Sequence, residues 1–215
     1  MLFFNDVITG LLLGSSVLLM GVFMDRFLSY ADYKEMVSNS STRQLYNQGI
    51  QAVKTNLLVL TPISYGIAKQ TVILNNVSSI NIIECLLFVC IHNFGYFCMH
   101  KLMHTTPKLY DCHAFHHKFD KVLIPSIGNA TSKREFLLAY VIPSLISSYI
   151  VKTNESTFVL AIYIISFFNL CIHCKPLTNI KWIPGLVTPL QHHEHHERRT
   201  IHYSASIVNY DWIFE

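Results

Sequence analysis

Apolar residues run through this chain in long stretches separated by polar segments. The first stretch, residues 7–24, contains eighteen residues and no charge. Three more apolar stretches cover residues 81–99, 136–151 and 157–173. Because about 20 helical residues cross the hydrocarbon core of a bilayer, these stretches predict membrane-spanning helices.

The segment 57–74 is also apolar, but Pro62, Gly66 and Lys69 interrupt it. Such a segment forms either a kinked membrane span or a helix lying in the membrane interface. We therefore expect an all-α integral membrane helical bundle with four to five membrane segments. The stretch 7–24 lacks the basic start and the small-residue cleavage site of a signal peptide, so we expect a retained anchor.

The stretches 136–151 and 157–173 are joined by only five polar residues, 152–156. Two helices with so short a link form an antiparallel hairpin that returns to the side it left. The segments before and after the hairpin therefore share one membrane face. Lysine and arginine are frequent in both segments, which places this face in the cytosol by the positive-inside rule.

Composition narrows the class of protein further. Hydrophobic residues make up 51% of the 215 residues, charged residues 13%, and the mean hydropathy is +0.35. This balance excludes a disordered, collagen-like or coiled-coil chain. The net charge of +3 is spread along the chain, so we expect no nucleic-acid partner. The six cysteines lie mostly in apolar stretches, which favours reduced thiols over a disulfide framework.

Histidine is the unusual residue, with twelve copies gathered mostly in three clusters. On a helix, positions i, i+3 and i+4 share one face, so we expect each cluster to project its imidazoles in one direction. Together the clusters offer more ligands than one metal ion can bind, and they predict a pair of ions. Neutral imidazole suits iron, zinc, copper and nickel better than magnesium or calcium. The eight residues are His100, His104, His113, His116, His117, His192, His195 and His196.

Three further histidines need separate interpretations. His193 lies off the face of its cluster, where we expect it to be solvated or to support a ligand. His92 precedes the first cluster by two turns in an apolar helix, where we expect a hydrogen-bonded core histidine. His173 ends the returning helix of the hairpin and is either a core histidine or a metal ligand. We predict a ninth ligand, because it lies at the depth of the clusters and completes the coordination of one ion.

The order of these motifs resembles the fatty acid hydroxylase and sterol desaturase superfamily of membrane di-iron oxygenases. His-x-x-x-His and His-x-x-His-His precede a hydrophobic hairpin, and a second His-x-x-His-His follows it. The resemblance implies an N-terminal anchor and polar connector in residues 1–53 and a catalytic domain in residues 54–215. It implies that the eight clustered histidines are catalytic metal ligands, and the superfamily also has a histidine near the place of His173. Further matching positions are 56–62, Tyr96, 106–110, Glu135, 202–203 and 211–214.

Two positions depart from the pattern of this superfamily. Asn93 replaces an acidic residue, and His202 replaces an asparagine; the sequence also ends at Glu215, before the superfamily's Gly-Thr. A carboxylate normally orients and strengthens a histidine ligand. We therefore expect Asn93 to weaken one such contact and to reduce activity without loss of the metal site.

The resemblance implies two iron ions that use O2 to hydroxylate or desaturate a C–H bond in a membrane lipid, either a sterol or a fatty acyl chain. The chain has no Gly-x-Gly-x-x-Gly motif, so two electrons must come through an external carrier, and the resemblance implies NAD(P)H as their source. The resemblance implies a cytochrome b5-type donor with its reductase, and we expect the endoplasmic reticulum membrane. Four basic residues either dock this carrier or flank the membrane: Lys118, Lys121, Arg198 and Arg199.

Two other classes of protein stay open on the residues alone. In a membrane zinc hydrolase, the same imidazoles activate water instead of O2. In a catalytically weak or inactive metal-binding membrane protein, turnover has been lost, as the departures at Asn93 and at the C-terminus allow. Metal analysis distinguishes the first alternative from an oxygenase, and lipid profiling distinguishes the second.

Overall fold

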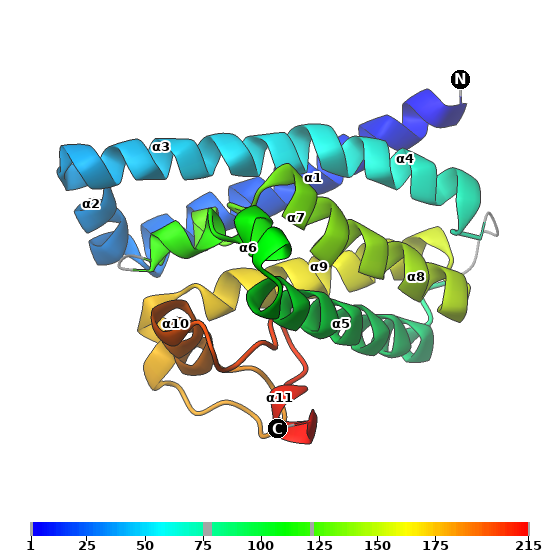
Figure 1. Ribbon diagram of the computed structural model, residues 1–215. Coiled ribbons are helices and arrows are strands. Elements are labelled where there is room, and N and C mark those ends of the chain that lie inside the picture. Colours follow the sequence, from blue (N-terminus) through cyan, green and yellow to red (C-terminus); the bar gives the residue numbers. More distant parts are fainter. Residues whose placement is uncertain (1, 75–78, 121–122, 215) are drawn as a thin grey trace.

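The computed structural model describes residues 2–74, 79–120 and 123–214, which form an all-helical bundle without a β-strand (Figure 1). The fold class predicted from the sequence is confirmed. Two of the elements, η1 and η4, are π-helical turns, and the other η elements are 3-10 turns. The elements are α1 Leu2–Phe27, α2 Tyr30–Ser38, α3 Ser40–Thr55, η1 Asn56–Leu60, α4 Thr61–Thr71, α5 Ile82–Thr105, α6 Pro107–His113, η2 His116–Phe119, η3 Pro125–Ile127, α7 Lys133–Glu135, η4 Phe136–Val141, α8 Ile142–Val151, α9 Glu155–Ile172, η5 Lys175–Asn179, α10 Pro189–Arg198 and α11 Asp211–Phe214.

Four helices are long and apolar enough to cross a membrane, and they mark the chain as a membrane protein. Each corresponds to one of the uninterrupted apolar stretches, and each extends a few residues beyond it because polar caps and flanking turns complete the helix. The four candidate spans are Phe4–Phe27, Ile82–Thr105, Lys133–Val151 and Glu155–Ile172.

The predicted hairpin is present. α8 ends at Val151, because the left-handed backbone of Lys152 (φ 55°) stops the helix, and Asn154 caps α9 by accepting a hydrogen bond from the Thr157 N–H. Both helices pack against α5. Because α9 returns to the end of the bundle from which η4 and α8 depart, the segments before and after the hairpin meet at one end.

The interrupted segment 57–74 forms the end of η1 and all of α4, and it is not among the four candidate spans. Figure 1 shows α4 running beside α1. Gly14 of α1 lies against Leu57, while nearer the start of α1 Asp6 accepts a hydrogen bond from Gln70 Nε2 at 2.6 Å. α4 is therefore antiparallel to α1 and packs along it, as expected for a kinked helix within the bundle and not for one lying across its end.

Each π-helical turn precedes a proline in the same helix. η1 leads to Pro62 and η4 leads to Pro143. Proline has no N–H to donate, and its ring collides with the preceding turn, so the helix widens locally. Widened turns are frequent at functional sites, and these two line the same cavity, described below.

The close approach of α1 to η1, the turn that leads into α4, depends on Gly14. A Cβ atom there would collide with the carbonyl oxygen of Leu57, a backbone atom that cannot rotate away. We expect Gly14→Ala to separate the helices and to lower the free energy of unfolding by about 1–3 kcal/mol. Thermal unfolding in detergent measures this, with Leu12→Ala on the exposed face of α1 as the control. An unchanged melting temperature for Gly14→Ala would contradict the packing.

Candidate metal centre

The three histidine clusters come together at one end of the bundle. The last turns of α5 carry the first cluster, and α10 carries the third. The prediction that each cluster lies on one helix is wrong for the middle one. His113 ends α6, whereas His116 and His117 lie in the 3-10 turn η2. The chain changes direction between them, after Pro107 has started the short α6.

Nine imidazoles form two groups, and within each group the nitrogens that can bind a metal lie within 4.8 Å of one another. The groups adjoin, because the ring centroids of His117 and His196, one from each group, are 4.8 Å apart. The first group is His100, His104, His113, His117 and His195, and the second is His116, His173, His192 and His196.

The two His-x-x-His-His clusters each divide their imidazoles between the groups, so the expectation that a cluster projects in one direction is wrong. On α10, His192 and His196 belong to the second group and His195 to the first. Consecutive helical residues are rotated by about 100°, so His195 projects to one side of the direction shared by His192 and His196. Each cluster therefore bridges the two groups.

His173 lies in the second group, where the sequence analysis predicted a ninth ligand. Its Nε2 is 3.0 Å from Nε2 of His192, which is in turn 3.2 Å from Nε2 of His196. Its Nδ1–H donates to the carbonyl oxygen of Asn169 at 2.6 Å, as a core histidine would also do. The position therefore suits a ligand held in place by a backbone carbonyl.

Hydrogen bonds on the outer nitrogens orient three imidazoles of the first group. His113 Nδ1–H donates to Glu135 Oε1 at 2.7 Å. His100 Nδ1–H donates to the Tyr203 carbonyl at 2.7 Å, and His195 donates in the same way to the carbonyl of residue 201 at 2.7 Å. Such partners fix the tautomer and direct the Nε2 lone pair inward.

The inward nitrogens face one another in a way that ordinary hydrogen bonds do not explain. Because His100 and His113 donate outward through Nδ1, their Nε2 atoms carry lone pairs in the neutral rings. These atoms are 2.9 Å apart, and His117 Nε2 is also 2.9 Å from that of His113. A cation between them removes the repulsion. Two nitrogens bound at right angles to one ion, each at about 2.1 Å, lie about 3.0 Å apart. The residues present therefore fit a metal.

The imidazoles outside the apolar helices are neutral near pH 7, which is the form that binds metal. Burial lowers the pKa of His195 to about 4, and burial likewise lowers the pKa of His173 to about 4. Burial, reinforced by His116 and His117, holds the pKa of His113 well below its usual value. A metal ion therefore displaces no proton from these rings near neutral pH.

Within the part of the chain that the structure describes, the hydrogen bonds of Asn93 go to backbone groups and not to a histidine, so the expected weakening of a ligand contact is wrong. Its side-chain oxygen accepts hydrogen bonds from the N–H groups of Ile207 and Val208, at 2.9 and 3.2 Å. An amide oxygen accepts these bonds as a carboxylate would. The carboxylate that orients a histidine is Glu135, which the sequence analysis noted only as a matching position.

Asp211 holds the C-terminal segment against the first group. Its carboxylate accepts hydrogen bonds from the backbone N–H groups of Tyr203 and Ser204, at 2.9 and 2.7 Å. Residue His202, beside them, has a left-handed backbone with φ 57°. Asparagine and histidine are both enriched in this region among residues other than glycine. This explains physically why histidine is tolerated where the superfamily has asparagine.

Asp211→Ala is expected to loosen the metal centre through Tyr203. The change leaves two buried N–H groups without acceptors, at about 1–3 kcal/mol each, and frees the carbonyl that orients His100. Loss of such outer partners lowers metal affinity by about 10- to 100-fold. Metal retained after dialysis against a chelator measures the effect, with the exposed Asp111→Ala as control. Wild-type retention in Asp211→Ala would contradict this role.

Besides His202, two histidines lie outside both groups. His193 is partly buried on α10 and does not join either set of nitrogens. His92 is 2% exposed, and its ring bonds the backbone of Tyr140, as expected of a core histidine. The sequence analysis missed that His92 also lines a cavity.

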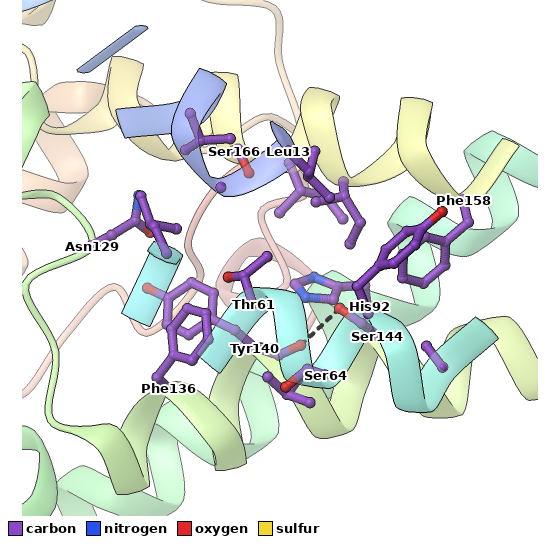
Figure 2. A pocket seen from close by; sticks show the side chains of 18 of the residues that line it. Leu13, Thr61, Ser64, His92, Asn129, Phe136, Tyr140, Ser144, Phe158 and Ser166 are labelled. Atoms are coloured by element: carbon purple, nitrogen blue, oxygen red, sulfur yellow. Dashed lines mark hydrogen bonds between the residues drawn. The ribbon is translucent and has the colours of Figure 1, made fainter. Parts of the chain in front are cut away.

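This cavity lies among the helices of the bundle and is partly open (Figure 2). Its walls come from α1, η1, α4, α5, η4, α8 and α9, with Asn129 and Phe136 toward the histidines. Asn129 accepts a hydrogen bond from Asn169 at 3.2 Å, and the Asn169 carbonyl holds His173. Phe136 directly follows Glu135, the partner of His113. Asn129 and Phe136 thus connect the lining of the cavity to residues that hold both groups.

The fold and the centre define a class of protein: a helical membrane protein with a histidine-rich centre suited to metal. The model of the fatty acid hydroxylase family matches residues 85–215, which are 131 of the 215 residues. The chain therefore belongs to the fatty acid hydroxylase family, within the sterol desaturase and fatty acid hydroxylase superfamily, and the resemblance noted in the sequence is confirmed. The family implies an oxidoreductase. No curated protein and no solved structure matches the chain.

Proposed function

We propose that this chain is a membrane-bound di-iron oxygenase that hydroxylates or desaturates a C–H bond of a lipid, either a sterol or a fatty acyl chain. The observation that supports this most is the convergence of nine imidazoles in two adjoining groups, together with a cavity among the helices, in a member of this family. Two iron ions held by these groups would supply the oxidising chemistry that lets O2 react with an unactivated C–H bond.

The residues of the chain have three tasks in this function. The nine imidazoles hold the metal, and the carboxylate and carbonyl partners described above orient them. Burial of the groups at the end of the bundle excludes water from the reacting atoms. The cavity holds the lipid in a fixed position, which decides the carbon that reacts and hence the choice between an alcohol and an alkene.

The zinc hydrolase alternative lacks a suitable base. Within the described residues, neither histidine group includes a carboxylate. Glu135 is bonded to His113 on its outer side, and Glu194 of the third cluster faces His202 at 3.3 Å. A metal-activated water needs a general base within hydrogen-bond reach.

Electrons have to arrive at the histidine end. We propose that a cytochrome b5-type carrier, reduced by NAD(P)H through its reductase, docks on the basic surface there. Lys118 and Arg198 are exposed, whereas Arg199 forms an ion pair with Asp120 at 3.2 Å. Lys121, expected in the same surface, lies outside the described residues. An acidic face on the carrier is complementary to these cations.

We propose an endoplasmic reticulum location with the histidine end in the cytosol. Protease sites inserted at the exposed residues Lys108 and Lys181 should then both be cut when only the plasma membrane is permeabilised. A site at Lys152, in the hairpin at the opposite end of the bundle, should be cut only after full solubilisation. Cleavage at Lys108 and Lys181 from opposite sides would contradict both the orientation and the shared metal centre.

The proposed function is tested by metal, oxygen and lipid measurements together. Purified protein should contain two irons per chain and consume O2 when a reduced carrier and lipid are supplied. Cells that express it should accumulate lipids with one added oxygen or two fewer hydrogens. Bound zinc without O2 consumption would support the hydrolase instead, and bound metal with unchanged lipids would support a protein without turnover.

A further inference from the structure

A single buried histidine stands out in the wall of the cavity. His92 lines it, is 2% exposed, and lies in the middle of the candidate span α5. One ring nitrogen bonds the backbone of Tyr140, and Nδ1 has no partner. With a carbonyl as the partner, the bonded nitrogen is the donor, and in the neutral ring Nδ1 is an acceptor. A buried acceptor without a donor is costly, so Nδ1 calls for a ligand with a hydrogen to donate.

Hydroxyl groups surround the same space. Thr61, Ser64 and Ser144 line the cavity together with His92, and Figure 2 shows all four around it. Ser144 donates to the Tyr140 carbonyl at 2.7 Å, which leaves its oxygen lone pairs available. His92 precedes His100 by eight residues, or about 12 Å along α5. His92 and the hydroxyls around it therefore form a polar region in a cavity that is mostly apolar, and His92 lies about two helical turns from His100.

The cavity has no charge to offer a ligand. Among the described residues that line it, none is Asp, Glu, Lys or Arg. Tyr65, which lines the cavity, donates a hydrogen bond to Glu155, and Glu155 forms an ion pair with Lys69 at 2.7 Å. These charges are satisfied by each other. A carboxylate or phosphate inside the cavity would be an unpaired charge at membrane depth, which is expensive.

The hydroxyls of Thr61, Ser64 and Ser144 come from two helices that pack on different partners, the first two from α4 and the third from α8. α4 packs mainly on α1, and α8 mainly on α5. Both helices carry exposed isoleucines beside their lining residues, such as Ile63 and Ile142. These outward faces are apolar, as expected for surfaces in contact with acyl chains. The cavity therefore suits an occupant that comes from the bilayer.

We propose that this cavity binds an uncharged lipid alcohol, whose hydroxyl donates a hydrogen bond to His92 Nδ1 and whose apolar body extends toward the histidine centre. This inference rests on the proposed function and names its substrate class. A sterol and a long-chain alcohol share the required chemistry, a single hydroxyl on an apolar body. A free fatty acid is expected to bind less tightly, because its carboxylate must take up a proton before it enters a cavity without charged side chains, and this costs free energy.

Equilibrium binding to metal-loaded wild-type protein in detergent tests the proposal without turnover, under anaerobic conditions. The probes are cholesterol against its analogue lacking the hydroxyl, and octadecanol against octadecane and stearate. We expect at least one alcohol to bind about tenfold more tightly than its hydroxyl-free analogue, the effect of one buried hydrogen bond, and stearate to bind more weakly than octadecanol. Equal binding of both alcohols and their analogues, or preference for stearate, would overturn the proposal. The alcohol that shows this preference identifies the ligand as a sterol or as a long-chain alcohol.

Variants assign the preference to His92. His92→Leu should abolish the difference between alcohol and hydrocarbon, and His92→Asn, which keeps an acceptor, should retain part of it. The matched control is Ser147→Ala, because Ser147 is buried on the same helix as Ser144, donates to a carbonyl at 2.7 Å, and does not line the cavity. A full preference in His92→Leu would refute the assignment. Intact preference with no O2 consumption would instead contradict only the proposed function.

Discussion

Replacing His195 by alanine is expected to abolish O2-dependent lipid oxidation, by more than about a thousandfold, and to lower the iron content below two per chain. His195 is the one residue of the third cluster that joins the first group. Its Nδ1 is fixed by a backbone carbonyl, and its buried Nε2 has no partner within the described protein. Residues that act as one unit lose nearly all activity when a single member is removed.

The matched control for this experiment is His193→Ala, two positions earlier on α10 and outside both groups. It should keep two irons per chain and wild-type oxidation. Iron is measured by mass spectrometry of the purified protein, and helical content by circular dichroism shows that the variants are folded. Full iron and activity in His195→Ala would contradict the assignment of the first group, and loss of both in His193→Ala would contradict the division of α10.

His173→Asn is expected to reduce bound iron from two per chain to about one and to stop lipid oxidation while the protein stays folded. The second group has only four imidazoles, and loss of His173 leaves three. Asparagine is too short to replace the Nε2 atom that faces His192 at 3.0 Å. A core histidine behaves differently, because its replacement lowers the melting temperature and leaves the metal unchanged.

His202→Asn provides the control for this second experiment. His202 follows the third histidine cluster in the sequence and belongs to neither group. Its backbone conformation is one that asparagine adopts readily. It should retain two irons and normal turnover. Two irons and normal turnover in His173→Asn would refute its assignment as a ligand, whichever way its stability changes.

Local sequence patterns determined the elements of the site because they depend on neighbouring residues alone. The length of the apolar stretches predicted four candidate spans, since a bilayer requires a minimum length of helix. The five polar residues 152–156 predicted the hairpin. Because the hairpin crosses the membrane an even number of times, the clusters before and after it were expected at the same end of the bundle. This expectation required no knowledge of how the helices pack.

The contacts that orient the imidazoles could not be predicted from the sequence. Glu135 meets His113 across 22 positions, and the carbonyl that holds His100 belongs to Tyr203, 103 positions away. Every residue has a backbone carbonyl, so the residue type does not show which carbonyl will accept a hydrogen bond from a histidine. Asn93 was misread for a similar reason, because its partners at Ile207 and Val208 are backbone N–H groups.

The sequence by itself determined that this is a membrane helical bundle with three histidine clusters at one end, because hydrophobic length and helical spacing are local properties. Only the tertiary structure decided how the imidazoles divide into two groups, since the middle cluster follows a turn and α10 projects His195 away from His192 and His196. It also decided that His92 lines a cavity, which requires five helices to be packed around one space. Such divisions arise from contacts between residues far apart in the chain, and those contacts exist only after folding.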